Sequence, residues 1–426
     1  MDPLPTSSMA GDRSRSREVA VLGGGVSGKA ARRLLESEGW EVQVFDEHGG
    51  DRGNPVFQPA PGQFSFAVVS PGFPVNHAWR SAAGEVGLQL VGESAYASSL
   101  WKGSVICVTG TNGKTTLTRL IEEALHRNGE NAFACGNIGR PFSDLCLGQT
   151  DREGWAVCEA SSFQLYDWAR VACDAGFWTN FDIDHLDWHP DLADYFSAKW
   201  KMVEAGNPVL AGPSVLRWAG EFGREIPGNL IAVEEGVTVD AAEIGVFGGK
   251  PWSELFSLIH RWWSMTGRDE KVLLDAAGDF ELSPHRMETV RVRNGVSFIN
   301  DSKATNPHAA LAAVGGVRGP VHWIGGGSWK GEDLASFAGL LAERISSADT
   351  FGSTGEELAE ILRREGCQSR FHPELREAFV AAVSHAQPGS TVLLSPGFAS
   401  FDQFSGYADR GEAFCNLVKC LNQPAR

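Results

Sequence analysis

The segment at residues 104–118, SVICVTGTNGKTTLT, constrains the fold more than any other part of the chain. It begins as an apolar, β-branched run with the length of a buried strand. A glycine-rich turn follows, and an apolar helical pattern starts at Lys114. Backbone N–H groups at a helix N-terminus attract anions, so this order of features predicts a phosphate-binding loop. The alternative, an ordinary strand-to-helix turn with a chance lysine, does not explain why all the features fall in register.

Lys114 is expected to reach the β- and γ-phosphates of a nucleotide, and Thr115 to hold Mg²⁺. The general P-loop pattern has a further glycine where Val108 stands, so the chain carries a shorter form, TGTNGKT. The residues expected to surround the phosphates are Gly110, Thr111, Asn112, Gly113, Lys114, Thr115 and Thr116.

Length and charge exclude several classes of protein. A chain of 426 residues has room for two or three domains. The net charge of -16 argues against nucleic-acid binding but not against anionic nucleotides, because a local field can be positive on an acidic protein.

No apolar run reaches the ~18 residues that a membrane span needs. Residues 1–17 are polar and are expected to form a disordered leader. Eight scattered cysteines without a C-x-x-C pair predict reduced thiols in a cytoplasmic protein and no zinc site.

A second glycine-rich motif lies near the N-terminus, in EVAVLGGGVSG at residues 18–28. A strand, a G-x-G-x-x-G turn, a helix at residues 29–38 and a second strand ending at Asp46 are typical of a dinucleotide or UDP site. Phosphate is expected near Val26 and Ser27, and a sugar hydroxyl at Asp46. The alternative is a tight turn that only packs the helix on the strand.

The next strand, at residues 66–69, leads into a turn that contains Ser70 and Gly72. Proline and glycine at the carboxyl end of a strand favour a turn, which is expected to line the same crevice. The first unit ends near residue 100.

The central part of the chain offers ligands for a cation. The strand at residues 155–158 runs into Glu159, and a carboxylate at the end of a strand parallel to the P-loop strand suits Mg²⁺. The alternative is a charge at a helix N-terminus. An earlier turn, at residues 135–142, carries one polar side chain of interest, Asn137.

A denser cluster of ligand-type side chains follows at residues 179–189. Such a cluster suits a second cation, and the alternative is a solvated acidic loop. Its members are Asp182, Asp184, His185, Asp187 and His189. Lys199 lies in the next predicted helix and, from the residues alone, reads as a surface lysine. Residues 204–283 are less informative, although Trp262 and Trp263 are expected to pack in a core.

A third unit starts at residue 284. Strands at residues 295–300, 321–324 and 391–394 alternate with helical patterns, which predicts an α/β unit with a mostly parallel sheet. Functional groups should gather where these strands end. Asp301 and Lys303 follow the first strand and are expected either to pair with each other or to face a ligand.

The motifs together resemble the Mur ligases, from about residue 18 to near the end of the chain. The segments that carry the resemblance, in family order and spacing, are TGTNGKTT, GNIG, EASSFQL, NFDIDHLDWH with Lys199 downstream, HRME, INDSKATNP and LLSPGFASFDQF. The resemblance implies three α/β domains. These are a dinucleotide-fold-like domain that binds a UDP substrate (residues 18–100), a central P-loop domain that binds ATP (101–283) and a C-terminal domain that binds an amino acid (284–426).

The resemblance also implies a reaction. ATP phosphorylates a carboxylate of a UDP-linked muramoyl substrate, and an amine then attacks the acyl phosphate to give an amide, ADP and phosphate. Within the family, INDSKATNP and SPGFASFDQF point to D-glutamate as the amine and to UDP-N-acetylmuramoyl-L-alanine as its partner. The implied cofactors are ATP and Mg²⁺, and the implied protein is a cytoplasmic monomer with no membrane insertion and no nucleic-acid partner.

Residue roles follow from the same resemblance. Lys114 and Thr115 hold phosphate and Mg²⁺, Glu159 is a ligand of the first Mg²⁺, and His185 is a ligand of the second. Lys199 matches a carbamylated lysine that supports the second Mg²⁺. These catalytic and metal roles are implied by the family and not by the spacing of the residues.

Further roles concern the substrates. Asn137 matches a contact to the muramoyl substrate, Arg286 an arginine near the ATP phosphates, and Asp301 a nucleotide contact. The residues that match D-glutamate contacts are Lys303, Thr305, Lys330, Ser400, Phe401 and Tyr407.

The chain departs from the family in two places. The usual G-x-H-N segment is replaced by FGGKPW at residues 247–252, so no adenine contact is assigned. A usual Asn-Ala-Asp-Asp turn is replaced by NPVLAG at residues 207–212. Three other hypotheses are a ligase for a different amino acid, a catalytically silent binding protein, and a dinucleotide-dependent oxidoreductase. The last leaves the P-loop, Glu159 and His185 without a role.

Overall fold

The computed structural model describes residues 16–149, 151–169, 171, 173–186, 188–234, 239–329, 331 and 333–421. Nearly all of the predicted disordered leader, residues 1–15, therefore lies outside the described residues. Ser16 is the first described residue, and its Oγ donates a hydrogen bond to the Gln63 carbonyl at 2.7 Å. The chain forms two compact units: residues up to 181, 188–239 and 254–278 in the first, and residues 182–187, 240–253 and 279 onward in the second.

The first unit begins with a four-stranded parallel sheet in the order β2-β1-β3-β4. Its strands are β1 (Glu18–Leu22), β2 (Glu41–Phe45), β3 (Ala67–Val69) and β4 (Leu90–Gly92), and its helices are α1 (Val26–Ser37), α2 (Ala78–Glu85) and α3 (Glu93–Leu100). The strand and helix order confirms the predicted β-α-β start. Helix α1 begins at Val26, three residues earlier than expected, because the glycine-rich turn ends at Gly25.

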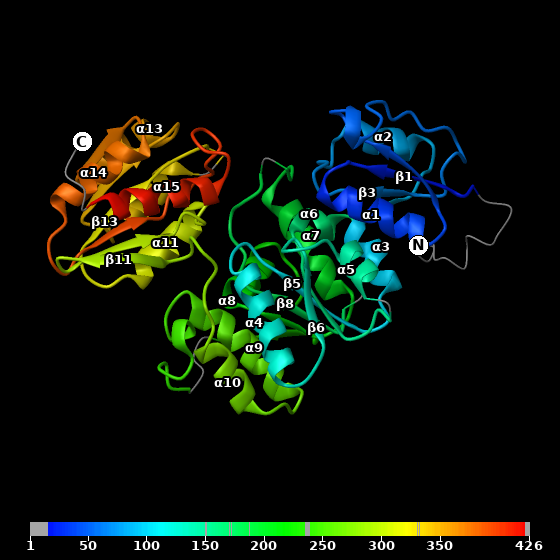
Figure 1. The fold of residues 1–426 in the computed structure, drawn as a ribbon, viewed down its shortest axis with the longest axis horizontal. Coiled ribbons are helices and arrows are strands. Elements are labelled where there is room, and N and C mark those ends of the chain that lie inside the picture. Colours follow the sequence, from blue (N-terminus) through cyan, green and yellow to red (C-terminus); the bar gives the residue numbers. More distant parts are fainter. Residues whose placement is uncertain are drawn as a thin grey trace. The chain divides into compact units, whose positions relative to one another are not determined.

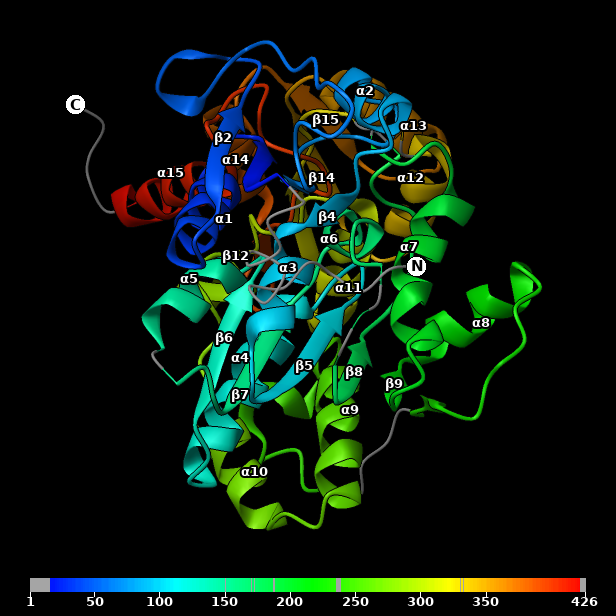
Figure 2. The ribbon, with the colours of Figure 1, turned by 90° about the vertical axis from the view of Figure 1, so that its right-hand side faces the viewer.

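The same unit contains a six-stranded parallel sheet in the order β10-β9-β8-β5-β7-β6. The strands are β5 (Ser104–Thr109), β6 (Ala132–Gly136), β7 (Trp155–Glu159), β8 (Ala175–Trp178), β9 (Val209–Ala211) and β10 (Leu230–Ala232). The helices are α4 (Lys114–Arg127), α5 (Phe142–Gly148), α6 (Ser162–Tyr166), α7 (Leu192–Glu204), α8 (Pro213–Glu221), α9 (Trp252–Met265) and α10 (Glu270–Gly278). Helix α4 packs on β6 and β7 (Figure 2).

The two sheets of the first unit share one hydrophobic core. Helices α1 and α3 pack against α5 (Figure 1), and buried residues of both sheets join in a single cluster, among them Val19 and Cys107. Strand β5 lies between β7 and β8 and is buried at all but its first residue, which explains its continuous apolar sequence.

The second unit is built on another six-stranded sheet, in the order β11-β12-β16-β13-β14-β15, and β11 is its one antiparallel strand. The strands are β11 (Glu288–Arg293), β12 (Val296–Asn300), β13 (Val321–Gly325), β14 (Ser347–Phe351), β15 (Ser369–His372) and β16 (Thr391–Leu394). The helices are α11 (Pro307–Gly316), α12 (Leu334–Ala342), α13 (Gly355–Arg364), α14 (Leu375–His385) and α15 (Tyr407–Cys420). The predicted mostly parallel sheet is confirmed.

The expectation that Trp262 and Trp263 pack in a core is also confirmed, because both side chains are buried. All eight cysteines are free thiols in the structure. None of the helices in the described ranges combines the length and the apolar character that crossing a membrane requires.

The tryptophans surround an ion pair that connects the central sheet to α9 and α10. Arg268 donates from Nε and Nη2 to the two carboxylate oxygens of Glu130 at 2.8 and 2.9 Å. Trp155 Nε1 donates to the same carboxylate at 2.8 Å, and the guanidinium lies 4.7 Å from the Trp262 ring centroid. The hydrogen bond from Arg268 is the largest cause that lowers the pKa of Glu130 from its ordinary 4.5 to about 2.

We expect this ion pair to make stability depend on pH. Because the folded-state pKa is depressed, the pair stabilises the protein above pH 4.5 and loses its effect as the pH falls from 4.5 toward 2. Glu130→Gln should lower the unfolding free energy at pH 7 by on the order of 2 kcal/mol, and the difference from the natural protein should shrink at pH 3. Urea unfolding at both pH values measures it. Glu123→Gln, in the exposed pair with Arg127, is the control; an equal loss at both pH values would contradict the expectation.

Candidate active site

The phosphate-binding loop has the geometry that its sequence predicts. Gly110 has a φ of +148°, and a Cβ there would lie 1.8 Å from the Thr179 hydroxyl oxygen. Gly113 has a φ of +83° and precedes the first residue of α4. Both positions therefore require glycine, and Lys114 and Thr115 open the helix in the predicted positions.

Residues from the neighbouring strand brace this loop. Thr179 Oγ1 donates to the Asn112 carbonyl at 2.6 Å, and the Thr111 N–H donates to the Asn180 carbonyl at 3.0 Å. Asn180 also accepts from the Asn112 N–H at its Oδ1, at 2.8 Å. Thr179 and Asn180 directly follow β8, which pairs with β5. Sequence reasoning assigned them no role, although their place at the end of a parallel strand was the available signal.

Lys114 lies over the loop that it belongs to. Its Nζ donates to the carbonyls of Gly110 at 2.8 Å and Thr111 at 2.9 Å. The ammonium group is thus held at the helix N-terminus, where phosphate oxygens would replace or join these carbonyls. Thr115 is half-buried and Thr116 is buried.

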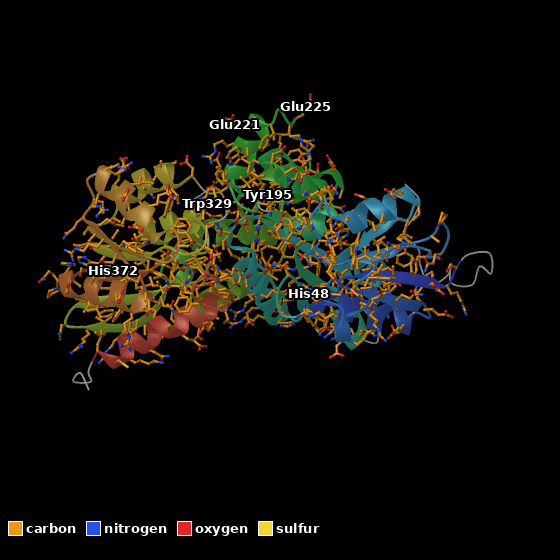
Figure 3. The ribbon with its side chains drawn as sticks, turned by 90° about the horizontal axis from the view of Figure 1, so that it is seen from above. His48, Tyr195, Glu221, Glu225, Trp329 and His372 are labelled. Carbon is orange, nitrogen blue, oxygen red and sulfur yellow. The ribbon has the colours of Figure 1, made fainter. Side chains whose placement is uncertain are left out.

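Lys199 is not a surface lysine, contrary to the reading of its local sequence. It is 1% exposed, and its Nζ donates to the Gly110 carbonyl at 3.0 Å and to Thr109 Oγ1 at 3.3 Å. The ammonium also lies 4.9 Å from the ring centroid of Tyr195, one helical turn earlier on α7. The Tyr195 hydroxyl lies 3.1 Å from Thr111 Oγ1 (Tyr195 is labelled in Figure 3). Packing of α7 on the P-loop buries the lysine, and no local pattern reports that packing.

Glu159 is a buried carboxylate with one satisfied oxygen. It stands at the end of β7, opposite Val108 of the P-loop strand, and is 2% exposed. Its Oε1 accepts from Asn137 Nδ2 at 2.9 Å, whereas no described residue donates to the buried Oε2. A buried carboxylate oxygen without a donor is unfavourable, and a cation would satisfy it. The residues present therefore fit Mg²⁺.

The pairing of β6 with β7 explains why Asn137 and Glu159 meet. Gly136 is opposite Glu159 in the sheet, so the residue after β6 reaches the last residue of β7. The alternative in which Glu159 is a helix N-terminal charge is not supported, because Ser161 and Gln164 form the capping box of α6.

The members of the predicted second-cation cluster are divided between the two units, and their assembly into one group stays a prediction. His189 is 1% exposed, and its ring nitrogens lie 2.6 Å from Asp194 Oδ2 and 2.9 Å from Ser162 Oγ. Both nitrogens are engaged, so His189 connects α6 to α7 and is not placed as a metal ligand. Asp187 lies outside the described residues.

The other members of the cluster belong to the second unit. Asp184 Oδ2 accepts from Asn306 Nδ2 at 3.0 Å, and Asp182 Oδ2 lies 3.5 Å from His308 Nε2. His185 has a φ of +58°, uncommon for a residue with a side chain, and its ring is 28% exposed. Its role as a metal ligand stays a prediction.

The N-terminal glycine loop is held by a predicted site residue. Asp46 Oδ2 accepts from the Gly24 N–H at 2.7 Å, and its Oδ1 accepts from the His48 N–H at 3.0 Å. Burial raises the pKa of Asp46, but the hydrogen bonds from Gly24 and His48 outweigh burial and lower it. Asp46 thus positions the loop, and its contact to a sugar stays a prediction.

The remaining N-terminal site residues lie in or beside this loop. Val26, at the start of α1, is 74% exposed, and Ser27 is half-buried. Ser70 Oγ donates to the Gly23 carbonyl at 3.1 Å, and Gly72 is exposed. The glycine loop and the 70–74 turn therefore touch, as the shared crevice requires.

In the second unit, Asp301 is buried at the end of β12. Burial raises its pKa to about 7, against the hydrogen bonds from Ser395 Oγ at 2.8 Å and the Met287 N–H at 3.2 Å. Lys303 Nζ lies 3.7 Å above the ring centroid of Tyr407, so two residues expected to contact D-glutamate meet in the fold.

The other residues of this predicted group differ in exposure. Thr305 is half-buried, Ser400 is buried, and Phe401 is 73% exposed. Lys330 lies outside the described residues. Arg286 stands between His285 and Met287, whose φ angles of +64° and +45° mark a strained turn.

Sequence reasoning missed Arg410, which connects the loop that contains Ser302 to the loop that contains Phe398. It is fully buried on α15, and it donates from Nε to Ser302 Oγ at 3.0 Å and from Nη2 to the Ser302 carbonyl at 2.9 Å. Its Nη1 donates to the Phe398 carbonyl at 3.0 Å. Burial lowers its pKa to about 10. No motif marks this residue, since its partners are mostly backbone atoms.

One group of metal-ligand type occurs within the described ranges, formed by His285, Glu288 and Cys415. The Asn300 amide nitrogen already lies among the three, 2.8 Å from His285 Nδ1, 3.3 Å from Glu288 Oε2 and 3.2 Å from Cys415 Sγ. The amide fills the centre of the group, so the group gives no support for a metal site.

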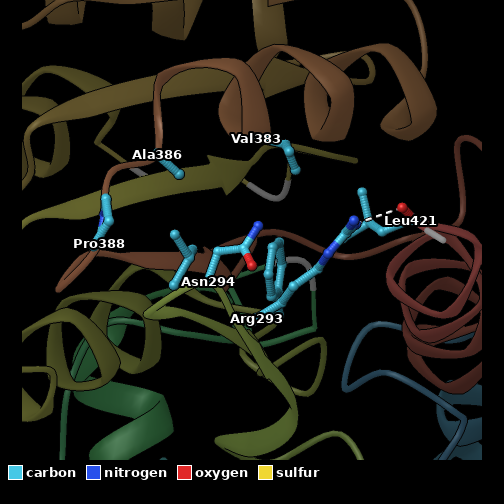
Figure 4. A pocket seen from close by; sticks show the side chains of 8 residues that line it. Arg293, Asn294, Val383, Ala386, Pro388 and Leu421 are labelled. Carbon is cyan, nitrogen blue, oxygen red and sulfur yellow. Dashed lines mark hydrogen bonds between the residues drawn. The ribbon is translucent and has the colours of Figure 1, made fainter.

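Two pockets of the second unit contain none of the predicted site residues. A pocket of about 290 Å³ is lined by Arg293, Val383 and their neighbours, and Arg293 donates to the Leu421 carbonyl at its edge (Figure 4). The other, of about 700 Å³, lies between α14 and α15.

Comparison with known proteins decides the family. Residues 108–210 match the Mur ligase middle domain, and residues 285–398 match the Mur ligase, glutamate ligase domain. A UDP-N-acetylmuramoylalanine–D-glutamate ligase from Synechocystis is 31% identical, over 93% of this chain and 98% of that protein. The chain belongs to the Mur ligase family, in its UDP-N-acetylmuramoylalanine–D-glutamate ligase branch. A ligase of the same name from Aquifex aeolicus is 33% identical to this Mur ligase. The match covers 94% of this Mur ligase and 98% of the Aquifex protein.

Solved structures of other ligases share the fold of this chain. A UDP-N-acetylmuramate-alanine ligase from Thermotoga maritima has a TM-score of 0.57 at 15% identity, covering 94% of this Mur ligase and 99% of that chain. A pseudomurein peptide ligase type C from Methanothermus fervidus has a TM-score of 0.57 at 14% identity. The match covers 95% of this Mur ligase and 100% of that chain. In this Mur ligase, the segment that replaces G-x-H-N forms a short 3₁₀ turn (Gly245–Gly248) and the start of α9, and its adenine contact stays unassigned.

Proposed function

We propose that the protein uses ATP to join D-glutamate to UDP-N-acetylmuramoyl-L-alanine, a step of peptidoglycan precursor synthesis. The observation that carries the proposal is the P-loop of β5 and α4 beside the buried, half-satisfied carboxylate of Glu159. The full-length similarity to curated D-glutamate ligases supports the choice of substrates.

The chemistry begins with a poor electrophile. A carboxylate resists attack by an amine, so the γ-phosphoryl group of ATP is first transferred to it, which releases ADP and gives an acyl phosphate. The amine of D-glutamate attacks the acyl carbon, and the tetrahedral intermediate expels phosphate to leave an amide. Negative charge gathers on the phosphoryl oxygens, and positioned cationic groups stabilise it.

Residues of the first unit, with His185 of the second unit, divide this work. Lys114 neutralises charge on the β- and γ-phosphates, and the N–H groups of the P-loop orient them. Thr115 and Glu159 would hold Mg²⁺, which when bound neutralises phosphate oxygens. We further assign a second Mg²⁺ to His185 and to Lys199 in carbamylated form. That modification would convert the ammonium over the Gly110 carbonyl into an anionic ligand.

The substrates take separate places. Val26, Ser27, Asp46, Ser70 and Gly72 are assigned to the UDP moiety, because the glycine loop and the 70–74 turn meet there. Asn137, which donates to Glu159, is assigned to the muramoyl substrate.

The second unit supplies the remaining contacts. Arg286 and Asp301 are assigned to the nucleotide. The residues assigned to D-glutamate are Lys303, Thr305, Lys330, Ser400, Phe401 and Tyr407. We place the enzyme in the cytoplasm as a monomer; its eight free thiols support a reducing compartment.

Phosphate release tests the proposal. With ATP, Mg²⁺ and UDP-N-acetylmuramoyl-L-alanine, we expect release on addition of D-glutamate and none on addition of L-glutamate, glycine, L-alanine or L-lysine. Mass spectrometry of the product should show the added glutamate. Release with another amino acid instead would move the specificity, and no release from folded protein would contradict the ligase function.

A further inference from the structure

We propose that Arg80 is a positioning residue that fastens the substrate turn at residues 70–74 to the C-terminal end of helix α6, and thereby sets the place of the UDP-linked substrate. The inference rests on the proposed function of that turn. Neither Arg80 nor its partner Asp167 belongs to any motif of the chain.

Four hydrogen bonds hold the Arg80 guanidinium. Nη1 and Nη2 donate to the two carboxylate oxygens of Asp167, each at 2.7 Å. Nε and Nη2 donate to the Phe73 carbonyl at 3.2 and 3.0 Å. The two side chains are 8% and 7% exposed. Arg80, on α2, therefore connects a backbone carbonyl of the turn to the residue that ends α6 (both helices are labelled in Figure 1).

On one side, Arg80 binds the 70–74 turn, and that turn packs against the glycine loop. Phe73 is buried, and a Cβ at Gly23 would lie 2.9 Å from its ring. Ser70, in the same turn, donates to the Gly23 carbonyl. A shift of the Phe73 carbonyl would thus move the turn relative to the loop that carries Val26 and Ser27.

On the other side, Asp167 belongs to the element that follows the candidate magnesium ligand. Helix α6 starts three residues after Glu159, and Asp167 is its C-terminal cap. Asp167 also accepts from the Gly92 N–H at its carbonyl, at 2.9 Å. The contacts therefore run from the substrate turn through Arg80 and one short helix to the candidate magnesium site.

The chemistry of the pair explains why it would act as a clamp. A planar guanidinium matches a carboxylate with two parallel hydrogen bonds, a geometry that lysine cannot reproduce. Because both groups are buried, removing either leaves an unpaired charge, and the turn must move to let water reach it. The pair of Arg33 on α1 with Asp144 on α5 is 54% and 28% exposed, and neither residue lies in the glycine loop or in the 70–74 turn. Exposed pairs contribute little.

Steady-state kinetics and calorimetry test the clamp with Arg80→Met, Arg80→Lys and Asp167→Asn, and with Arg33→Met as the matched control. We expect Arg80→Met and Asp167→Asn to raise KM for UDP-N-acetylmuramoyl-L-alanine and its Kd by about tenfold or more, since small displacements of positioning groups have large effects. The KM for ATP should change by less than about twofold. Arg80→Lys should lie between the natural enzyme and Arg80→Met, and Arg33→Met should match the natural enzyme.

Two results would overturn the inference. One is a loss of kcat with the KM and Kd of the UDP substrate unchanged, which a merely structural role predicts because it reduces the amount of folded enzyme. The other is unchanged kinetics and binding in every variant. If Arg80→Met does not fold, Arg80→Lys and Asp167→Asn decide in the same way. Failure of the proposed function would appear separately, as no phosphate release by the natural enzyme, and binding of the UDP substrate would still test the clamp.

Discussion

Lys114→Ala should reduce turnover by about 10³-fold or more, which corresponds to roughly 4 kcal/mol of lost transition-state stabilisation. The reason is electrostatic. The Lys114 ammonium is held over the Gly110 and Thr111 carbonyls at the N-terminus of α4, where the β- and γ-phosphates are expected. Its removal leaves the charge that develops during phosphoryl transfer without this cationic side chain.

The measurement is phosphate release at saturating substrates, together with a thermal melt that confirms folding. Lys271→Ala is the control, since that lysine is 77% exposed and pairs with Asp275 along its own helix. The control should keep full turnover. Near-normal turnover of Lys114→Ala would show that TGTNGKT does not act as a phosphate loop.

Lys199→Ala should have the second-largest effect, a loss of about 10²-fold or more in turnover. Lys199 is buried against the P-loop, where its Nζ contacts the Gly110 carbonyl and Thr109. If the lysine is carbamylated, formate or acetate added to the variant should restore part of the activity, because a short carboxylate replaces the carbamate. Activity of the natural enzyme should then also fall in buffer depleted of carbon dioxide.

The control for Lys199→Ala lies on the same helix. Lys201 donates to the Tyr166 carbonyl and makes no contact with the P-loop among the described residues, so Lys201→Ala should keep turnover in its folded fraction. A large loss in Lys199→Ala without carboxylate rescue would assign the lysine to bracing the P-loop as a cation. Full activity would remove Lys199 from the site.

Strands and glycine turns were predictable because local physics determines them. A buried parallel strand needs a continuous apolar run, which Val105–Val108 and Thr391–Leu394 show, and their neighbours in the sheet confirm it. Position 110 requires glycine because Thr179 approaches the backbone closely there. A turn that only glycine can form is visible in the sequence as a glycine at that position.

The environments of charged side chains were not predictable in this way. The local pattern that predicted β5 correctly also predicted that Lys199 lies on the surface. It grouped His189 with the ligands of a cation. In the fold, α7 buries the lysine on the P-loop, and His189 joins Asp194 to Ser162. Contacts of this kind connect residues far apart in the chain, and side-chain type alone does not specify them.

The sequence alone therefore determined the fold class, the phosphate loop and, through family motifs, the reaction. Periodicity and glycine turns are local, and motif order reflects shared ancestry. Only the tertiary structure decided which carboxylate oxygen lacks a donor, at Glu159, and which arginines hold the loops, at Arg80 and Arg410. The physical reason is that burial and hydrogen-bond satisfaction depend on every element that packs around a group, and those elements come from distant parts of the chain.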